Sequence, residues 1–358
     1  MNQIFKDLKV IELASVLAGP AVGMFFAELG AQVIKIENKN TAGDVTRGWK
    51  LSSESKERNY SAYYCSVNWH KEVWMLDLKE QIDRDQLYQL IKEADIIVAN
   101  YRPGSAEKLG VDYKTLKEIN PRLIYANLTS FGEDSSRPAF DIVLQAETGF
   151  LFMNGESKRD PVRMPVALID LMAAHQLKEG ILIALLKRYQ TGQGSFITTS
   201  LYEAAIASLA NQATNWLMEN HIPQRMGSQH PNIAPYGDIF YTSDKKPIVL
   251  AVGTEQQFIN LCKVLKLPLL SDNKEFNTNP KRVKNRVDLN KILEVPISNI
   301  KSLDLIDALS KANVPAGLIR NMQEVFENPM AKKMILAEKM EDGLLSQRVR
   351  TVSFTINN

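Results

Sequence analysis

The sequence predicts an α/β protein with two domains: a larger, doubly wound domain built on a parallel β-sheet, and a smaller α+β domain. Three observations support this fold class. Residues 8–37 have the pattern of a strand, a helix and a second strand, and short apolar strands continue to alternate with helices up to about residue 200. Beyond residue 221 the pattern changes to strands followed by helices. Apolar strands that alternate with helices are typical of parallel sheets covered on both faces.

The first strand–helix–strand unit is recognised by its boundary residues. Residues 8–14 (LKVIELA) and 31–37 (AQVIKIE) are apolar strands, and residues 20–29 form the helix between them. Pro20 suits the first turn of this helix, and Gly30 suits the position just past its end. No G-x-G-x-x-G motif is present, so the usual mode of dinucleotide binding is not supported. Further strands are expected within 71–79, 95–99, 123–128 and 195–200, and further helices at 82–94, 113–119, 171–189 and 201–220.

A change of composition at residue 221 indicates the second domain. The loop over 221–237 is rich in Pro, Gly, Asn and Gln, and it precedes strands expected near 239–242 and 248–252. Helices are expected at 256–265 and 280–293, followed by a turn at 314–319. The predicted division is a large domain over 1–200, a linker helix and loop over 201–224, a small α+β domain over 225–320, and a segment returning to the large domain over 321–358.

Composition argues against several classes of function. A net charge of +2 from 43 basic and 41 acidic side chains gives no electrostatic reason to expect nucleic acid or an anionic membrane as partner. Cys65 and Cys262 lie far apart without metal-ligand spacing, so neither a disulfide framework nor a metal site is expected. No secretory signal is visible, and no apolar run approaches the roughly 20 residues that cross a bilayer. We therefore expect a cytoplasmic protein.

One carboxylate, Asp170, stands out because it interrupts the apolar run 164–174 just where a helix is expected to begin. A charged group among aliphatic neighbours is unfavourable unless something compensates it. Asp is a favoured N-cap residue, so Asp170 can be explained as the cap of the helix that follows. The alternative is a reactive carboxylate at the mouth of a site. The spacing alone leaves both interpretations open.

Eight motifs, spread over nearly the whole chain, resemble those of the family III CoA-transferases and occur in the same order. This family includes formyl-CoA:oxalate and crotonobetainyl-CoA:carnitine transferases and, more distantly, α-methylacyl-CoA racemases. The motifs are LKVIELASVLAGPAVGMFFAELGAQVIKIE, GDVTRGW, ADIIVANYRPGSAEKLGVDY, INPRLIYANLTSFG, AFDIVLQAETG, PVALIDLMAAHQLKEGILIALLKR, QHPNIAPYG and VPAGLI. The resemblance implies a Rossmann-like large domain, a small domain, and a homodimer of two interlocked, ring-like subunits with active sites between the domains of both chains.

The resemblance also assigns roles to individual residues. It makes Asp170 the catalytic nucleophile, and it places Phe140 and Asp141 beside the substrate. The expected contacts to coenzyme A are Leu17, Ala18, Asn38 or Lys39, Leu76, Asp77, Leu78, Lys79, Asn100, Tyr101, Arg102, Lys108 and Arg137. Independently of the resemblance, the glycine-containing loop with Gly227, Ser228 and Gln229 is a candidate source of backbone N–H donors for an oxyanion, or simply an interdomain turn.

The function implied is transfer of CoA from an acyl-CoA to a small carboxylate through an aspartyl anhydride and an aspartyl-CoA thioester on Asp170. Neither ATP nor a metal is needed, and the sequence contains no phosphate-binding loop. Two alternatives are an α-methylacyl-CoA racemase and an inactive CoA-binding homologue. The racemase is disfavoured because Phe140 stands where that branch has a proton-exchanging His. Oxalate is disfavoured as acceptor because the loop around Gly227 lacks the glycine run of oxalate-specific enzymes.

Overall fold

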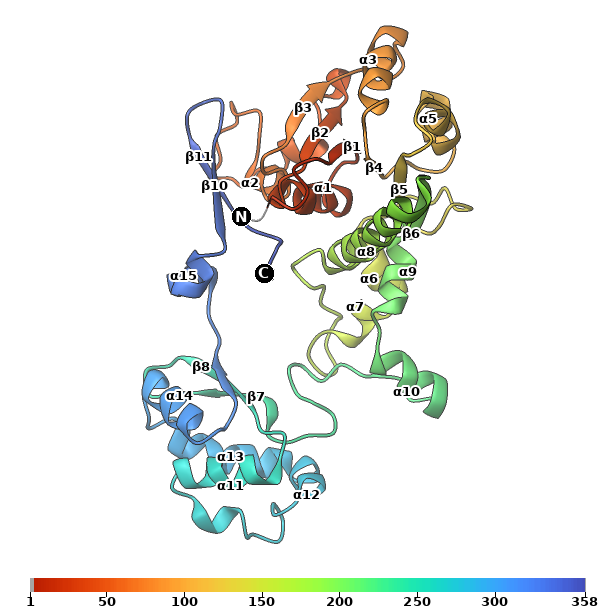
Figure 1. Ribbon diagram of the computed structural model, residues 1–358. Coiled ribbons are helices and arrows are strands. Elements are labelled where there is room, and N and C mark those ends of the chain that lie inside the picture. Colours follow the sequence, from red (N-terminus) through yellow and green to blue (C-terminus); the bar gives the residue numbers. More distant parts are fainter. Residues whose placement is uncertain (1–2, 358) are drawn as a thin grey trace. The chain divides into compact units, whose positions relative to one another are not determined.

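The computed structural model describes residues 3–357, which form two compact units (Figure 1). The first unit consists of the chain up to Phe150, Met164–Ile222 and the chain from Met330 onward. The second unit consists of Leu151–Arg163 and Pro223–Pro329. The second unit is therefore inserted into the sequence of the first. Leu151–Arg163 lies inside the range 1–200 that the sequence analysis assigns to the large domain, yet it packs with the second unit.

A six-stranded parallel sheet forms the centre of the first unit, as the alternating strand–helix pattern predicts. Its strands are β1 (Lys9–Leu13), β2 (Gln32–Glu37), β3 (Glu72–Met75), β4 (Ile96–Ala99), β5 (Ile124–Thr129) and β6 (Ser195–Ser200). Their order across the sheet is β3-β2-β1-β4-β5-β6, and every neighbouring pair is parallel. The strand order reverses between β1 and β4. Ligands of open α/β sheets bind outside the carboxyl ends of the strands at such a point.

Helices cover the sheet on both faces because successive strand residues point to opposite sides. Val10 in β1 packs in a cluster with α1 (Ala18–Glu28) and α8 (Leu168–Thr191). Its neighbour Ile11 packs in a second cluster with α3 (Gln81–Ile91) and α5 (Tyr113–Ile119). The fold class predicted for this part of the chain, a doubly wound α/β sheet, is confirmed in its architecture. The remaining short elements of this unit are η1 (Lys39–Thr41), η2 (Val45–Gly48), α2 (Ala62–Cys65), α4 (Ser105–Leu109), α6 (Asp141–Glu147), α9 (Leu201–Ala207) and α10 (Asn211–Glu219).

The last segment of the chain returns to the first unit. It forms an antiparallel hairpin from β10 (Ile335–Lys339) and β11 (Leu345–Val349), which the sequence analysis does not predict. Beyond the hairpin, the buried carboxylate of Glu28 in α1 accepts hydrogen bonds from the Thr351 backbone N–H (2.6 Å), the Thr351 hydroxyl (2.8 Å) and the Val352 N–H (3.1 Å). This polar contact joins two segments that are more than 320 residues apart in the sequence.

The second unit combines a small antiparallel sheet with helices. The sheet contains β7 (Tyr236–Tyr241), β8 (Pro247–Ala251) and β9 (Ala316–Leu318). The helices are α11 (Glu255–Val264), η3 (Pro268–Leu270), α12 (Asn279–Lys284), α13 (Arg286–Ile297), α14 (Ser302–Lys311) and α15 (Met322–Glu327). Two short helices, α7 (Phe150–Met153) and α16 (Pro329–Lys332), lie where the chain passes between the units.

Two predicted helices are each interrupted in the structure. The helix expected over 201–220 is divided into α9 and α10, with Ala210 at a φ of 48° between them. The Ser208 hydroxyl, at the end of α9, donates to the Ala204 carbonyl (2.7 Å), and side-chain hydrogen bonds of this kind slightly destabilise and bend a helix. The helix expected over 280–293 is divided at Asn285, whose side chain donates to the Glu275 carbonyl (3.0 Å).

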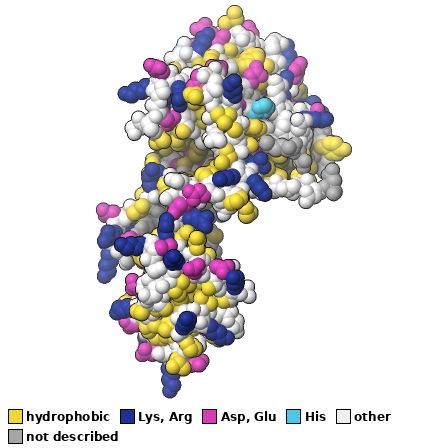
Figure 2. Space-filling model, turned by 90° about the vertical axis from the view of Figure 1, so that its left-hand side faces the viewer, with side chains coloured by type: hydrophobic (Ala, Val, Ile, Leu, Met, Phe, Trp, Pro, Cys, Tyr) yellow, Lys and Arg dark blue, Asp and Glu magenta, His cyan; other side chains and the backbone are white. Residues whose placement is uncertain are grey.

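The surface agrees with the balanced composition. On the face shown in Figure 2, basic and acidic side chains lie interspersed rather than in fields of one sign. Over residues 3–357, no helix is both long and apolar enough to cross a bilayer.

Candidate active site

The carboxyl end of the parallel sheet bears a pocket of about 340 Å3, which we call the Asp170 pocket. Three strand ends contribute to it: residues 15–18 follow β1, residues 100–103 follow β4, and residues 128–130 end β5. The remaining walls are residues 135 and 137–140, Val45, Asp170 and Leu201. The pocket thus lies where the strand order of the sheet predicts a ligand site.

Asp170 is the third residue of α8 and is only 8% exposed. It does not cap this helix, so the capping interpretation is wrong. The N-cap position is held by Ala167, and the side chain that accepts a hydrogen bond from the first turn belongs to Asp141, whose Oδ1 lies 2.7 Å from the Ile169 nitrogen. Among residues 3–357 the Asp170 carboxylate has no hydrogen-bond partner. It is therefore a buried carboxylate that faces a pocket and is not used for local structure.

The surroundings of Asp170 disfavour its charge. Burial and, after it, the nearby negative charge of Asp141 raise the pKa of Asp170 from 3.8 to about 7. Burial, followed by the charge of Asp170, raises the pKa of Tyr63 to about 12, so this phenol is protonated at neutral pH. A carboxylate with a pKa near neutrality, next to a pocket and without a structural role, is typical of a functional group.

Eight of the residues singled out in the sequence come together in this pocket. They are Leu17, Ala18, Asn100, Tyr101, Arg102, Arg137, Phe140 and Asp170. Asp141 lies behind the wall at the start of α6, where it is buried. Asn100 also fixes the loop after β1, since its side chain accepts from the Ser15 N–H (3.1 Å) and donates to the Ser15 carbonyl (2.9 Å). The Arg137 guanidinium stacks on Phe131 and pairs with Glu147 (2.6 Å).

Seven other expected contacts to coenzyme A lie outside this lining, and two of them, Asp77 and Leu78, are buried. Asn38 and Lys39 follow β2, and Leu76 and Lys79 follow β3, the edge strand of the sheet. The Lys39 ammonium pairs with Asp83 (2.7 Å), and the Asn38 side chain caps η1. Lys108 is exposed on α4. A contact of these residues with coenzyme A therefore remains a prediction.

The loop with Gly227, Ser228 and Gln229 belongs to the second unit, where it borders a pocket of about 410 Å3. Gln229 Nε2 donates to Asp238 (2.9 Å), and the Ser228 hydroxyl donates to the Gly237 carbonyl (2.5 Å). An added Cβ at Gly237 would lie 1.8 Å from the Ser228 carbonyl oxygen. These contacts explain the loop as a local turn, and its role as an oxyanion donor stays a prediction.

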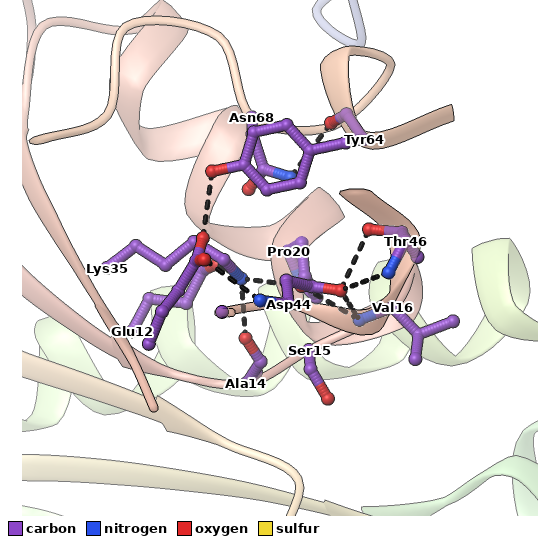
Figure 3. A network of polar contacts seen from close by, with 12 residues as sticks. Glu12, Ala14, Ser15, Val16, Pro20, Lys35, Asp44, Thr46, Tyr64 and Asn68 are labelled. Atoms are coloured by element: carbon purple, nitrogen blue, oxygen red, sulfur yellow. Dashed lines mark hydrogen bonds and ion pairs between the residues drawn. The ribbon is translucent and has the colours of Figure 1, made fainter. Parts of the chain in front are cut away.

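Several pocket residues were not singled out in the sequence. They include Ser15 and Val16 after β1, Thr129 and Ser130 at the end of β5, and Ser135. They could have been predicted, since polar residues at the carboxyl ends of adjacent parallel strands meet at one edge of the sheet. Asp44 does not follow a strand directly, so its place near the pocket could not be predicted in this way. It accepts a hydrogen bond from the N–H of the pocket residue Val16, and it belongs to a buried ion network with Glu12, Lys35 and Lys71. Figure 3 shows Glu12, Lys35 and Asp44 of this network.

The sequence pattern that defines CoA-transferase family III matches residues 5–358. The chain belongs to this family. A succinate–glutarate CoA-transferase of Agrobacterium fabrum is 34% identical over 352 residues, which cover 96% of this chain and 87% of that protein. The human succinyl-CoA:glutarate CoA-transferase is 36% identical over 346 residues, which cover 95% of this chain and 78% of that protein. A crystal structure of a CAIB/BAIF family protein from Brucella suis superposes with a TM-score of 0.86 at 35% identity, covering 99% and 93% of the two chains. The protein is thus a CoA-transferase, as the sequence motifs predict.

Proposed function

We propose that this CoA-transferase moves coenzyme A from an acyl-CoA to a small carboxylate, with Asp170 as the covalent nucleophile. The observation that supports this proposal is the placement of Asp170: it is buried, lacks a hydrogen-bond partner within residues 3–357, and borders the pocket at the carboxyl end of the sheet. A purely structural carboxylate in such surroundings would be left uncompensated.

The reaction then proceeds by exchanges of acyl bonds. A carboxylate oxygen of Asp170 attacks the thioester carbonyl of the donor, and CoA thiolate leaves to give an acyl–aspartyl anhydride. The thiolate attacks the aspartyl carbonyl and releases the donor acid, which leaves Asp170 as a CoA thioester. The acceptor carboxylate attacks this thioester and forms a new anhydride, from which the thiolate takes the acyl group. Free Asp170 is regenerated, and no redox partner or net proton is required.

The pocket offers groups suited to coenzyme A. Residues Leu17 and Ala18 lie at the start of α1, where helix N–H groups favour anionic oxygens. Arg102 and Arg137 supply cations for phosphates, and Arg137 would have to exchange its Glu147 partner for the ligand. We propose that Tyr101 and Asn100 complete this part of the binding site. Asn38, Lys39, Leu76, Lys79 and Lys108 would serve a more distant part of the ligand.

The acceptor that we favour is a short dicarboxylate of the succinate and glutarate class. Relatives that match more than nine-tenths of this chain are named as succinate–glutarate and succinyl-CoA:glutarate CoA-transferases. The wall beside Asp170 also contains apolar side chains, among them Leu17 and Phe140, which suit the methylene groups of such acids. A racemase requires a residue that exchanges the α-proton, and the described pocket lining contains no histidine.

Trapping of the covalent intermediate tests the proposal. Enzyme is incubated with succinyl-CoA or glutaryl-CoA, with and without hydroxylamine, and the peptide carrying Asp170 is examined by mass spectrometry. We expect a CoA adduct on Asp170 and, with hydroxylamine, a hydroxamate and loss of activity. Exchange of α-hydrogen with deuterated water and no adduct would indicate a racemase. Thermal stabilisation by CoA with neither adduct nor exchange would indicate a binding protein.

The pKa of Asp170 predicts how adduct formation depends on pH. Only the ionised carboxylate attacks, so the rate of adduct formation should rise between pH 6 and 8 with a midpoint near the pKa of about 7. In Asp141→Asn, loss of the neighbouring charge should move the midpoint to lower pH, because Asp141 raises the pKa of Asp170. Single-turnover rates measured from pH 5.5 to 8.5 check this. A flat profile over that range would contradict the assignment of Asp170 as nucleophile.

We also propose that the protein is a homodimer of interlocked subunits. Ile183, Leu186 and Tyr189 form an apolar stripe along α8 and are 67%, 68% and 92% exposed. Helix faces that meet water are normally polar, so this stripe suits contact with a second copy. Light scattering should give twice the mass of one chain. Leu186→Glu should lower that mass, whereas Ile82→Glu, at an exposed apolar residue on α3, should not.

A further inference from the structure

The loop that joins β1 to α1 is held at three consecutive backbone positions. The Lys35 ammonium donates to the Ala14 carbonyl (2.7 Å). Asn100 bonds both polar groups of the Ser15 backbone. The Asp44 carboxylate accepts from the Val16 N–H, with Oδ2 at 3.2 Å. Figure 3 shows Lys35, on β2, and Asp44, in the segment that follows β2, pointing toward this loop.

The central residue of this loop is in a strained conformation. Val16 has a φ of 75°, in the left-handed region. For a β-branched residue this region is a genuine outlier, since the side chain crowds the backbone there. Such a conformation persists only where the surroundings impose it, and outliers of this kind cluster at functional sites. The Val16 N–H bond to Asp44 is the direct constraint on this residue.

Asp44 is itself fixed from several directions. Its carboxylate pairs with Lys35 (3.1 Å) and accepts from the backbone N–H (3.0 Å) and hydroxyl (2.8 Å) of Thr46. Lys35 pairs in turn with Glu12 (2.9 Å), and Glu12 pairs with Lys71 (2.7 Å). The side chains of Glu12, Lys35, Asp44 and Lys71 are all inaccessible to solvent. Because solvent does not reach these four side chains, we look for the effect of the network in the backbone that it contacts.

Stability alone does not account for such a network. Buried ion pairs are costly to desolvate, and apolar residues of similar size often stabilise a protein equally well. The network also touches α1 directly, since Lys71 donates to the Pro20 carbonyl (2.8 Å). The network thus bonds to the backbone of the segment from Ala14 to Pro20, and residues 15–18 of that segment line the Asp170 pocket.

We propose that Asp44 is a positioning residue: held by Lys35 and Thr46, it keeps Val16 in the left-handed conformation, so that residues 15–18 line the Asp170 pocket in the arrangement that binds coenzyme A. This inference rests on the proposed function only in naming the ligand. The structural effect on Val16 is independent of it.

The test is a double-mutant comparison with free coenzyme A as the probe and calorimetry as the measurement. Asp44→Ala should weaken CoA binding by at least about tenfold, because Val16 then relaxes out of its strained conformation. Glycine adopts the left-handed region without strain. In the Val16→Gly background, the Asp44→Ala change should therefore weaken binding by less than about threefold relative to Val16→Gly alone. Equal losses in the two backgrounds, or no loss in either, would overturn the proposal.

A matched control separates positioning from general loss of stability. Asp95 also accepts from a backbone N–H, that of Lys9 (2.8 Å), and also pairs with a basic side chain, Arg188 (2.9 Å), but at the amino end of the same sheet. Asp95→Ala should lower the unfolding temperature and leave CoA affinity within about twofold. A comparable loss of CoA affinity in Asp95→Ala would show that any such deletion has this effect and would overturn the proposal.

Two further measurements decide the outcome if Asp44→Ala does not fold or if wild type does not bind coenzyme A. Asp44→Asn keeps the shape of the side chain and removes its charge. It should weaken CoA binding in the wild-type background, and the loss should be smaller in the Val16→Gly background. A crystal structure of either Asp44 variant should show Val16 with a negative φ. A Val16 that stays left-handed without Asp44 would overturn the positioning role. Failure of wild type to bind CoA would contradict the proposed function instead.

Discussion

Asp170→Asn is expected to abolish the CoA adduct and to lower turnover by at least about three orders of magnitude, the scale of loss seen when a covalent nucleophile is removed. An amide cannot attack the thioester as a carboxylate does. The side chain keeps its shape, and Asp170 makes no hydrogen bond within residues 3–357, so the substitution breaks no local contact. Adduct detection by mass spectrometry and turnover with succinyl-CoA and glutarate measure the effect.

The same substitution should make the protein more stable at pH 8. The pKa of Asp170 is about 7 in the folded protein against 3.8 ordinarily, so the folded state binds more protons between these values. The free energy of unfolding therefore falls as the pH rises from 3.8 through 7, because the folded protein resists ionisation of Asp170. The total loss from this group is on the order of 4 kcal/mol. At pH 8 Asp170→Asn removes this destabilising charge and should unfold at a higher temperature than wild type. At pH 5 the carboxyl is protonated in the folded protein but still ionised in the unfolded chain, so the difference should be smaller than at pH 8, and it should largely disappear only below pH 3.8.

Asp304→Asn is the matched control for both effects. Asp304 is also the third residue of its helix, α14, but it is exposed and lies in the second unit. The exchange should leave adduct formation unchanged and should not raise the unfolding temperature at pH 8, because a negative charge in the first turn of a helix is favourable when solvated. Retention of the adduct in Asp170→Asn would show that another residue carries the covalent step.

Gly194→Ala is expected to be the most destabilising single methyl addition on the parallel sheet. An added Cβ at Gly194, just before β6, would lie 2.1 Å from the Leu123 carbonyl oxygen and 2.7 Å from the Arg122 carbonyl carbon. Both are backbone atoms next to β5, so the two strands would have to separate. We expect a loss of about 3 kcal/mol or more in the free energy of unfolding, at the upper end for overpacking. Urea unfolding, followed by circular dichroism, measures it.

Gly48→Ala provides the comparison. No atom lies within 4 Å of the position of its added Cβ, and Gly48 does not have a positive φ. The change should be neutral within about 0.5 kcal/mol or slightly stabilising, since alanine restricts the unfolded chain. Similar unfolding free energies for the two variants would contradict the packing described at Gly194.

The parallel sheet could be predicted because its signals are local. Apolar strands with helical segments between them are visible in the sequence, and Pro20 and Gly30 indicate the ends of α1 within two residues. The exact ends of other helices are harder to predict from the sequence. The break at Ala210 has no Gly or Pro to indicate it; it follows Ser208, whose hydroxyl donates to the Ala204 carbonyl.

The candidate site could be predicted only in part. Family motifs identified Asp170 and seven other residues of its pocket, and the strand order explains why they meet. The spacing offers Asp170 as one possible helix cap, and it cannot show that the carboxylate bonded to the first turn is Asp141, because Asp141 lies 28 residues from the N–H group it accepts from. The ion network was missed for the same reason: Glu12, Lys35 and Lys71 look like ordinary charges until the sheet brings them together.

The contact between Glu28 and residues 351–352 limits when the first unit can complete its packing during translation. Glu28 leaves the ribosome more than 320 residues before the residues that supply its three hydrogen-bond donors. Until those donors are synthesised, α1 must either stay unburied or bury an unsatisfied carboxylate. The nascent first unit therefore cannot reach its final packing before residues 351–352 have been synthesised, which lengthens the interval in which chaperones have access to it.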